Sequence, residues 1–289
     1  IVVLSSANLA LLDNAGTIDG GGVAVRTQTG ASIDAISNTG TIGVIANGGT
    51  IGAGAGPAIT STGRDASIGS IINSGTINQG FQIENQDVSV GAGGGYGVFN
   101  SGTLNVVNGN LTFTDGTLGL NADVSVNGGG GTFINQAILA LADTQNVTGN
   151  FQQTSAGTSL IDLLGWTSGS YGHLGISGAA DFAGELSLDD YLLPGGLTGG
   201  HTLDLFSFAS YIGGFSSLAV DGTLLASLGG GQWAYGSLTL TEVWTDTTMS
   251  LTVTGPAGVP EIDPNSFGSV LALVLGALGM LERRRLKAA

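Results

Sequence analysis

The chain has 289 residues, of which 53 are Gly, 5 are Pro and none is Cys. Disulfide scaffolds and thiolate metal sites are therefore excluded, and an apolar fraction of 42% argues against intrinsic disorder. The formal net charge is −15, and between residues 1 and 259 two basic residues stand against 18 acidic ones, so we expect no binding to nucleic acid, whose phosphates are neutralised by Lys and Arg.

A degenerate repeat, Asn-x-Gly-Thr-Ile/Leu, runs through residues 1–150. Its copies begin at Asn14, Asn38, Asn47, Asn73 and Asn100. Asn and Gly tolerate positive φ, which favours a tight turn, and Thr-Ile then starts a short strand. Strands this short must lie on neighbouring coils, so 1–150 is predicted to be a repeat β-solenoid, similar to a parallel β-helix. A Gly-rich β-sandwich with similar turns is the alternative.

The solenoid prediction assigns places to particular side chains. We expect Ile18, Ile42, Ile77 and Leu104 to point into one apolar interior. The Asn-Gly pairs should lie at the corners between strands. Asn side chains at the same place in successive coils would then join in an amide ladder.

The composition changes near residue 150. Asn occurs 16 times before residue 151 and once after it, whereas 5 aromatic residues precede that point and 13 follow it. Alternating patterns such as 248–254 predict that 151–254 is also β-rich. This region is expected to be either wider, irregular final coils or a small sandwich that caps the solenoid, because an uncovered last coil would expose strand edges.

The last residues form a separate module, in which 255–264 is a linker and 265–289 a hydrophobic helix with a basic tail. Residues 267–281 carry no charge, and four cations follow: Arg283, Arg284, Arg285 and Lys287. We expect a short transmembrane helix, with its cationic end cytoplasmic and the acidic body outside. A C-terminal helix buried against the body is the alternative.

This tail resembles a PEP-CTERM-type sorting signal, in which a Pro-Glu motif precedes a short transmembrane helix and an Arg cluster. The matching motif, similar to the Val-Pro-Glu-Ile-Asp variant, is Val259, Pro260, Glu261, Ile262, Asp263 and Pro264. The resemblance implies an exported bacterial protein that is handled by an exosortase-type sorting enzyme and is often tied to extracellular polysaccharide. The coils of 1–150 are also similar to passenger segments of autotransporter-like surface proteins.

Residues that support catalysis are sparse. The sequence contains no phosphate-binding loop and no serine-hydrolase elbow, and His173 and His201 stand in expected loops without a local partner. The two acidic clusters, Asp189-Asp190 and Asp181 with Glu185, are interpreted as turn-capping and solvated acids. Consecutive strand residues point to opposite faces, so Asp189 and Asp190 make a poor catalytic pair. We therefore predict no catalytic residue, no cofactor and no metal site.

Aromatic residues of the second half have two interpretations. They could form a sugar-stacking surface, but packing in the core is the more ordinary explanation. The residues concerned are Trp166, Tyr171, Trp233, Tyr235 and Trp244.

The sequence thus predicts a non-enzymatic, exported structural protein of the cell surface or extracellular matrix, sorted or anchored through its C-terminal signal. A carbohydrate-active β-solenoid enzyme and a carbohydrate-binding adhesin are the alternatives. An enzyme needs a groove with convergent carboxylates, and an adhesin needs an exposed aromatic strip. A structural solenoid needs neither.

Overall fold

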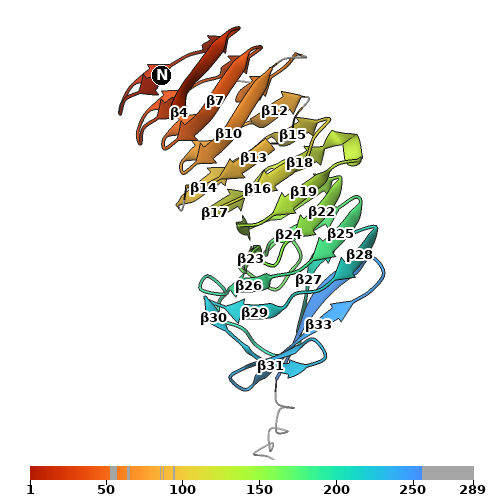
Figure 1. Ribbon diagram of the computed structural model, residues 1–289. Coiled ribbons are helices and arrows are strands. Elements are labelled where there is room, and N and C mark those ends of the chain that lie inside the picture. The colour runs from red at the N-terminus through yellow and green to blue at the C-terminus, as the bar shows by residue number, and fades with distance from the viewer. Residues whose placement is uncertain (53–56, 64–65, 85, 87, 94, 256–289) are drawn as a thin grey trace, which may run out of the picture. The chain divides into compact units, whose positions relative to one another are not determined.

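Three β-sheets wind around one interior in the computed structural model, which describes residues 1–52, 57–63, 66–84, 86, 88–93 and 95–255. Residues Ile1–Thr254 form one unit, and Gly255–Ala289 form a second, of which Gly255 alone is described. Through most of the first unit, successive strands belong to successive sheets, so the chain returns to each sheet one coil further along. The unit is an all-β parallel solenoid of about eight turns, which confirms the fold class predicted from the repeat (Figure 1).

Each sheet is built from strands that follow one another along the solenoid. Sheet A contains β1 (Val2–Val3), β4 (Thr17–Thr27), β7 (Thr41–Asn47), β10 (Ser67–Asn73), β13 (Val88–Gly91), β16 (Leu111–Phe113), β19 (Thr132–Asn135), β22 (Asn150–Gln153), β25 (Ala179–Phe182) and β28 (Ser210–Gly213). Sheet B contains β2 (Asn8–Leu9), β5 (Ser32–Ile33), β8 (Thr50–Ile51), β11 (Thr76–Ile77), β14 (Tyr96–Phe99), β17 (Thr117–Leu120), β20 (Ile138–Leu141), β23 (Thr158–Asp162), β26 (Glu185–Asp189), β29 (Ser217–Val220) and β30 (Thr223–Leu224). Sheet C contains β3 (Leu12–Asn14), β6 (Ile36–Asn38), β9 (Ile59–Ser61), β12 (Gly80–Glu84), β15 (Thr103–Val107), β18 (Asp123–Val126), β21 (Thr144–Thr148), β24 (His173–Ile176), β27 (His201–Ser207), β34 (Thr248–Thr254), β33 (Leu238–Trp244), β32 (Gln232–Tyr235) and β31 (Ala226–Gly229). A short 3-10 turn, η1 (Asn127–Gly129), follows β18.

The Asn-x-Gly-Thr-Ile/Leu motifs lie at corners, as predicted, but at three different ones. Asn14 and Asn38 end strands of sheet C, and their Thr-Ile pairs open strands of sheet A. Asn47 and Asn73 stand between sheets A and B, and Asn100 stands between sheets B and C. Unequal spacings between consecutive copies therefore arise because Asn38 and Asn47 are separated by one side, whereas the other copies are separated by one coil or by one coil plus one side.

Glycine occupies several of these corners because the coils approach closely. A Cβ placed on Gly40 or Gly75 would overlap the carbonyl oxygen of Gly16 or Gly49 in the preceding coil. Of the motif glycines, Gly102 has a positive φ, of 82°. The predicted reason for glycine, a turn with positive φ, is thus right at Gly102 and wrong at the other four copies. At Gly40, Gly49 and Gly75 it is the stacking of the coils that excludes a side chain.

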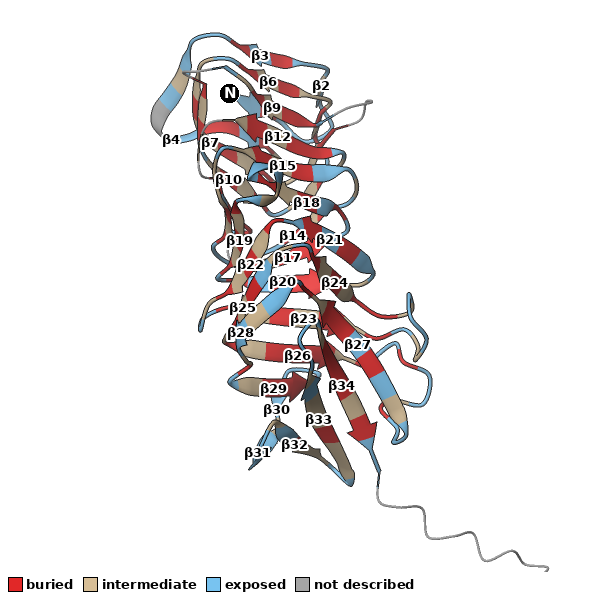
Figure 2. Ribbon diagram, turned by 90° about the vertical axis from the view of Figure 1, so that its right-hand side faces the viewer, coloured by how far each residue is buried: buried red, intermediate tan, exposed pale blue. Residues whose placement is uncertain are grey.

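The interior is apolar, and three of the four residues predicted to line it are fully buried. Ile42, Ile77 and Leu104 are each 0% exposed, whereas Ile18 is half-buried and packs against the core. Ile18 is less covered because β1 pairs with β4 only at Arg26 and Thr27. Figure 2 shows the alternation along the strands, with buried and more exposed residues following one another.

Two kinds of side-chain stack run through the coils. Amide ladders join Asn14 to Asn38 (2.8 Å) and Asn47 to Asn73 (2.9 Å), as predicted, and the first continues from Asn38 to Ser61 Oγ at 3.0 Å. Further along, buried Phe rings replace Ile in the interior, with successive ring centroids 4.9–6.1 Å apart. These rings belong to Phe81, Phe99, Phe113, Phe133, Phe151, Phe182 and Phe206.

The strand order changes near the end of the described chain. Coil-to-coil pairing is parallel as far as β28 and β29. Strand β34 then pairs antiparallel with β27, and β33, β32 and β31 extend sheet C antiparallel beyond it. Sheet B also ends in an antiparallel pair, β29 with β30, so residues 151–254 contain further parallel coils followed by antiparallel extensions of sheets B and C.

Candidate functional site

A cleft of about 500 Å³ lies on the outer face of sheet B, and we call it the sheet B cleft. The alternation of β23 and β26 turns Leu160, Ser187 and Asp189 outward, while Ile161 and Leu188 belong to the buried core. The outward residue Ser187 is small and 5% exposed, which leaves the face hollowed there. The lining residues are Ile138, Thr158, Leu160, Glu185, Ser187, Leu188, Asp189, Tyr191, Asp221 and Gly222.

Three carboxylates lie along one side of this face, one from each of three successive coils. Asp162 and Asp189 are direct partners in the register of β23 and β26. Asp221 follows β29, and its N–H donates to the carbonyl of Leu188, so it lies one coil beyond Asp189. Burial, and then the charge of Asp189, raise the pKa of Asp162. Like charges are thus stacked at the spacing of the coils.

A fourth acid, Asp190, lies behind this row. Asp190 is 8% exposed, and its Oδ2 accepts the N–H of Leu197 at 3.1 Å. Burial, followed by the hydrogen bond to the Asp221 side chain, raises the pKa of Asp190. Asp189 faces the cleft and Asp190 is enclosed by the following loop, in agreement with the prediction that these neighbours do not form a pair.

Two tyrosines frame the same face. Tyr191 is 85% exposed, and its N–H donates to Asp189 Oδ1 at 3.1 Å. Tyr96 crosses the face further up, where a Cβ on Gly119 would lie 2.8 Å from its hydroxyl. Burial, and then the charge of Asp162, raise the pKa of Tyr96. The cleft therefore combines an exposed ring, aliphatic side chains, hydroxyls and carboxylates.

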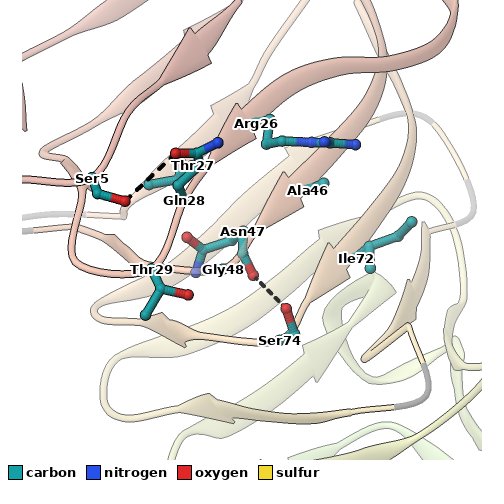
Figure 3. Close-up of a pocket in the computed structure, with 10 residues that line it drawn as sticks. All are labelled: Ser5, Arg26, Thr27, Gln28, Thr29, Ala46, Asn47, Gly48, Ile72 and Ser74. Atoms are coloured by element: carbon teal, nitrogen blue, oxygen red, sulfur yellow. Dashed lines mark hydrogen bonds between the residues drawn. The ribbon is translucent and has the colours of Figure 1, made fainter. Parts of the chain in front are cut away.

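A second, more polar pocket of about 400 Å³ lies near the first coils. Figure 3 shows its corner position, with Ser74 Oγ donating to the carbonyl of Asn47 at 3.2 Å and Ser5 Oγ to Gln28 Oε1 at 3.5 Å. Its lining holds the Arg26 guanidinium but no carboxylate. This pocket offers hydrogen-bonding groups without an acid–base pair.

The residues weighed for catalysis do not assemble into a triad. His173 Nε2 lies 3.2 Å from Ser207 Oγ, but its Nδ1 faces the backbone carbonyl of Asp204 at 2.8 Å. The Asp204 carboxylate instead accepts the hydroxyl of Ser250 at 2.7 Å. His201 stacks on Trp166 with ring centroids 4.0 Å apart.

Asp181 and Glu185 are separated by a corner. Asp181 lies in β25 of sheet A, where it accepts a hydrogen bond from Gln152 Nε2 at 3.1 Å. Glu185 opens β26 of sheet B and lines the cleft. Among the described residues, no group of three His, Asp or Glu side chains has the arrangement of a metal site.

The five aromatic residues weighed as a sugar-stacking strip take part mainly in packing. Tyr171 and Trp233 are buried, and Trp166, Tyr235 and Trp244 are half-buried against the core. The Glu242 carboxylate accepts the indole N–H groups of Trp233 (3.1 Å) and Trp244 (3.0 Å), and its pKa is raised because burial outweighs these two bonds. The interpretation of these residues as core residues is thus the better one.

The predicted sorting motif, Val259 to Pro264, and the basic tail, Arg283, Arg284, Arg285 and Lys287, lie outside the described residues. The same is true of the helix expected over 265–289. Within the part of the chain that the structure describes, no helix is long and apolar enough to cross a membrane. No family model, curated protein or solved structure matches this chain.

Sequence reasoning missed the carboxylate row and Tyr191. The sequence contains one signal for this row. In both Thr158-Ser-Leu-Ile-Asp162 and Glu185-Leu-Ser-Leu-Asp189, an Asp that points outward directly follows an aliphatic residue that points inward. Aligning these segments as neighbouring coils places the two aspartates together, as the register does. No comparable pattern marks Tyr191, which follows the strand in a loop.

Proposed function

We propose that this chain is an exported structural protein of the cell surface or extracellular matrix, without enzymatic activity, that is sorted or anchored through its C-terminal segment. The observation that carries this proposal is the continuous stacking of the coils. Parallel ladders, amide pairs and a column of Phe rings connect each coil to the next. Such stacking makes the body stiff, because each coil is held by its neighbours, as suits a protein exposed outside the cell.

The charge distribution supports the same role. An acidic body with two basic residues up to residue 259 repels nucleic acid and stays soluble in an extracellular setting. The four cations follow the uncharged run 267–281, an order that favours a membrane helix with a cytoplasmic end. The proposed partners are therefore the membrane, an exosortase-type sorting enzyme that recognises Val259 to Pro264, and extracellular polysaccharide.

Cell fractionation tests this proposal. The full chain is expressed in a bacterium with an exosortase-type enzyme, behind an export signal, beside a chain that lacks 265–289 and a chain with Arg283, Arg284 and Arg285 changed to Ser. We expect the full chain in the envelope or matrix fraction, the deletion in the medium or periplasm, and weaker retention of the Ser variant. Equal distribution of all three chains would contradict sorting through the tail.

A carbohydrate-active enzyme is the second candidate, and the pair Asp162 and Asp189 favours it. Retaining glycosidases need two carboxyl groups about 5–5.5 Å apart, one of them with a raised pKa. In-register residues on adjacent coils stand about 4.8 Å apart, and the pKa of Asp162 is raised. Release of reducing ends from a polysaccharide, lost in Asp162→Asn and Asp189→Asn, would establish this function in place of a purely structural one.

A further inference from the structure

We propose that the sheet B cleft binds a linear amino-sugar glycan, with its carboxylates on the ammonium groups and Tyr191 against a sugar ring. This inference deepens the matrix role proposed above, because it names the class of polysaccharide that the protein would hold. The inference rests on the proposed function in one respect: it assumes that the protein meets extracellular polysaccharide. The binding itself is argued from the residues of the cleft.

The position of the cleft decides how a ligand is recognised. It lies on the face of sheet B, where the backbone groups of β23 and β26 are used in the ladders between coils. A peptide strand adds to a sheet through free backbone groups at an edge, and these are not offered on a face. Recognition in the cleft must therefore come from side chains.

The charge of the cleft selects a cationic ligand. Its lining contains the carboxylates of Glu185, Asp189 and Asp221 and no basic side chain. Asp162 and Asp189 are direct partners on neighbouring coils, and burial, followed by the charge of Asp189, raises the pKa of Asp162. An ammonium group placed between neighbouring carboxylates removes this repulsion and forms charge-assisted hydrogen bonds.

The spacing of the carboxylates favours a repeating ligand over a single metal ion. Asp162, Asp189 and Asp221 come from three successive coils, whose backbones are about 4.8 Å apart at each step, and Asp189 and Asp221 line the cleft. Nowhere in the described chain do three such side chains gather as they would around one ion. A row of this kind matches a chain molecule that carries cationic groups at intervals along the solenoid axis.

The uncharged part of the lining favours a sugar over a Lys-rich peptide. Tyr191 is 85% exposed at the rim, and Ile138 and Leu160 supply aliphatic surface elsewhere in the same lining. The hydroxyls of Thr158 and Ser187 stand among them. A pyranose ring has an apolar C–H face and a rim of hydroxyls, and this mixture of an aromatic ring, aliphatic groups and hydroxyls complements both.

Calorimetric titration of the purified full chain tests the proposal with three probes: glucosamine oligomers, N-acetylglucosamine oligomers of the same length, and oligolysine. We expect glucosamine oligomers to bind at least about tenfold more tightly than either other probe, a difference of about 1.4 kcal/mol. Equal binding of the N-acetylated oligomer would overturn the role of the carboxylates. Equal binding of oligolysine would overturn the preference for a sugar.

Matched variants locate the binding. Asp189→Asn keeps the acceptor for the Tyr191 N–H and Tyr191→Ala alters an exposed side chain, so both should fold, which thermal melting followed by circular dichroism verifies. Each is expected to weaken glucosamine binding about tenfold. The control Asp123→Asn removes one charge from sheet C and also keeps its acceptor, for the Asn146 N–H at 2.9 Å. Equal weakening by Asp189→Asn and Asp123→Asn would overturn the site and leave a general charge effect.

These experiments separate the two proposals. Binding is measured on purified protein, whereas sorting is measured by fractionation of cells. Loss of sorting with intact binding would refute the role of the tail alone. Normal sorting without glucosamine binding would refute the present inference alone.

Discussion

The amide ladders make a quantitative prediction, because the motif Asn is buried at Asn73 and exposed at Asn100. Asn73 is 0% exposed and takes part in three hydrogen bonds. Its Oδ1 accepts Asn47 Nδ2 at 2.9 Å and the Gly75 N–H at 3.3 Å, and its Nδ2 donates to the carbonyl of Val98 at 3.2 Å. Asn100 occupies the same motif position but is exposed, and its Nδ2 donates to Asn78 Oδ1 at 3.1 Å.

Replacement of each Asn by Ala should therefore have unequal effects. In Asn73→Ala one buried group and two partly buried groups lose a partner, and at about 1 kcal/mol for each bond the free energy of unfolding should fall by about 3 kcal/mol. In Asn100→Ala water replaces the lost partner, so a decrease of about 0.5 kcal/mol or less is expected. The difference between the two variants, about 2.5 kcal/mol, measures burial of the ladder and not the motif itself.

Urea denaturation gives the global change, and native-state hydrogen exchange at the Gly75 amide gives the local one. The local measurement matters because solenoids open coil by coil, and a single global value then underestimates the damage. The Gly75 exchange rate should rise strongly in Asn73→Ala and stay near the native rate in Asn100→Ala. Equal losses of stability in the two variants would refute the argument that burial makes the ladder strong.

Two further predictions concern the corners and the acids. Gly75→Ala should prevent close stacking on Gly49 and lower the melting temperature by several degrees. Gly16→Ala is the control, because its Cβ would meet nothing within 4 Å, and it should leave the melting temperature nearly unchanged. Similar shifts of the melting temperature in both variants would contradict the argument that the coils approach closely at Gly75. The raised pKa of Asp190 means that the folded state favours the protonated acid, so this contribution to stability is present below the unfolded pKa and is lost as pH rises through the folded pKa. Asp190→Asn, which imitates the protonated acid toward Asp221, should be more stable than the native chain at pH 7 and lose less stability between pH 4 and 7, as melting curves at several pH values will show.

The sequence was sufficient to predict corners, but not which corner each motif forms. Asn38 and Asn47 are nine residues apart and stand at two successive corners of one coil. The motif specifies a bend followed by a short strand that starts with Thr and an aliphatic residue. Every side of the solenoid requires this same local structure. The three-sided cross-section therefore follows from the register of the strands, which the motif does not encode.

The cleft could not be predicted from a regular repeat, because the coil length is not constant. The register advances by 20 residues from Val106 to Val126 and by 32 from Leu174 to Phe206. Extra residues enter as loops at corners, where they do not disturb the stacked strands. Such variation hides the alignment of the acids in 151–254. In 1–150 the recurring Asn-Gly corners make the alignment of neighbouring coils visible in the sequence.

The end of the parallel stack shows why the aromatic residues gather in the second half. Sheet A ends at β28, the strand that follows β25 with Phe182. The interior next to Phe182 is therefore not covered by a further complete coil. Strand β33 supplies Trp244 there, whose ring centroid lies 4.9 Å from that of Tyr211 and 5.3 Å from that of Phe182. Large rings can close an open end that small β-branched residues would leave hydrated. Glu242 holds the Trp244 indole by a hydrogen bond, so this half-buried carboxylate with a raised pKa is explained by ring placement and needs no catalytic role.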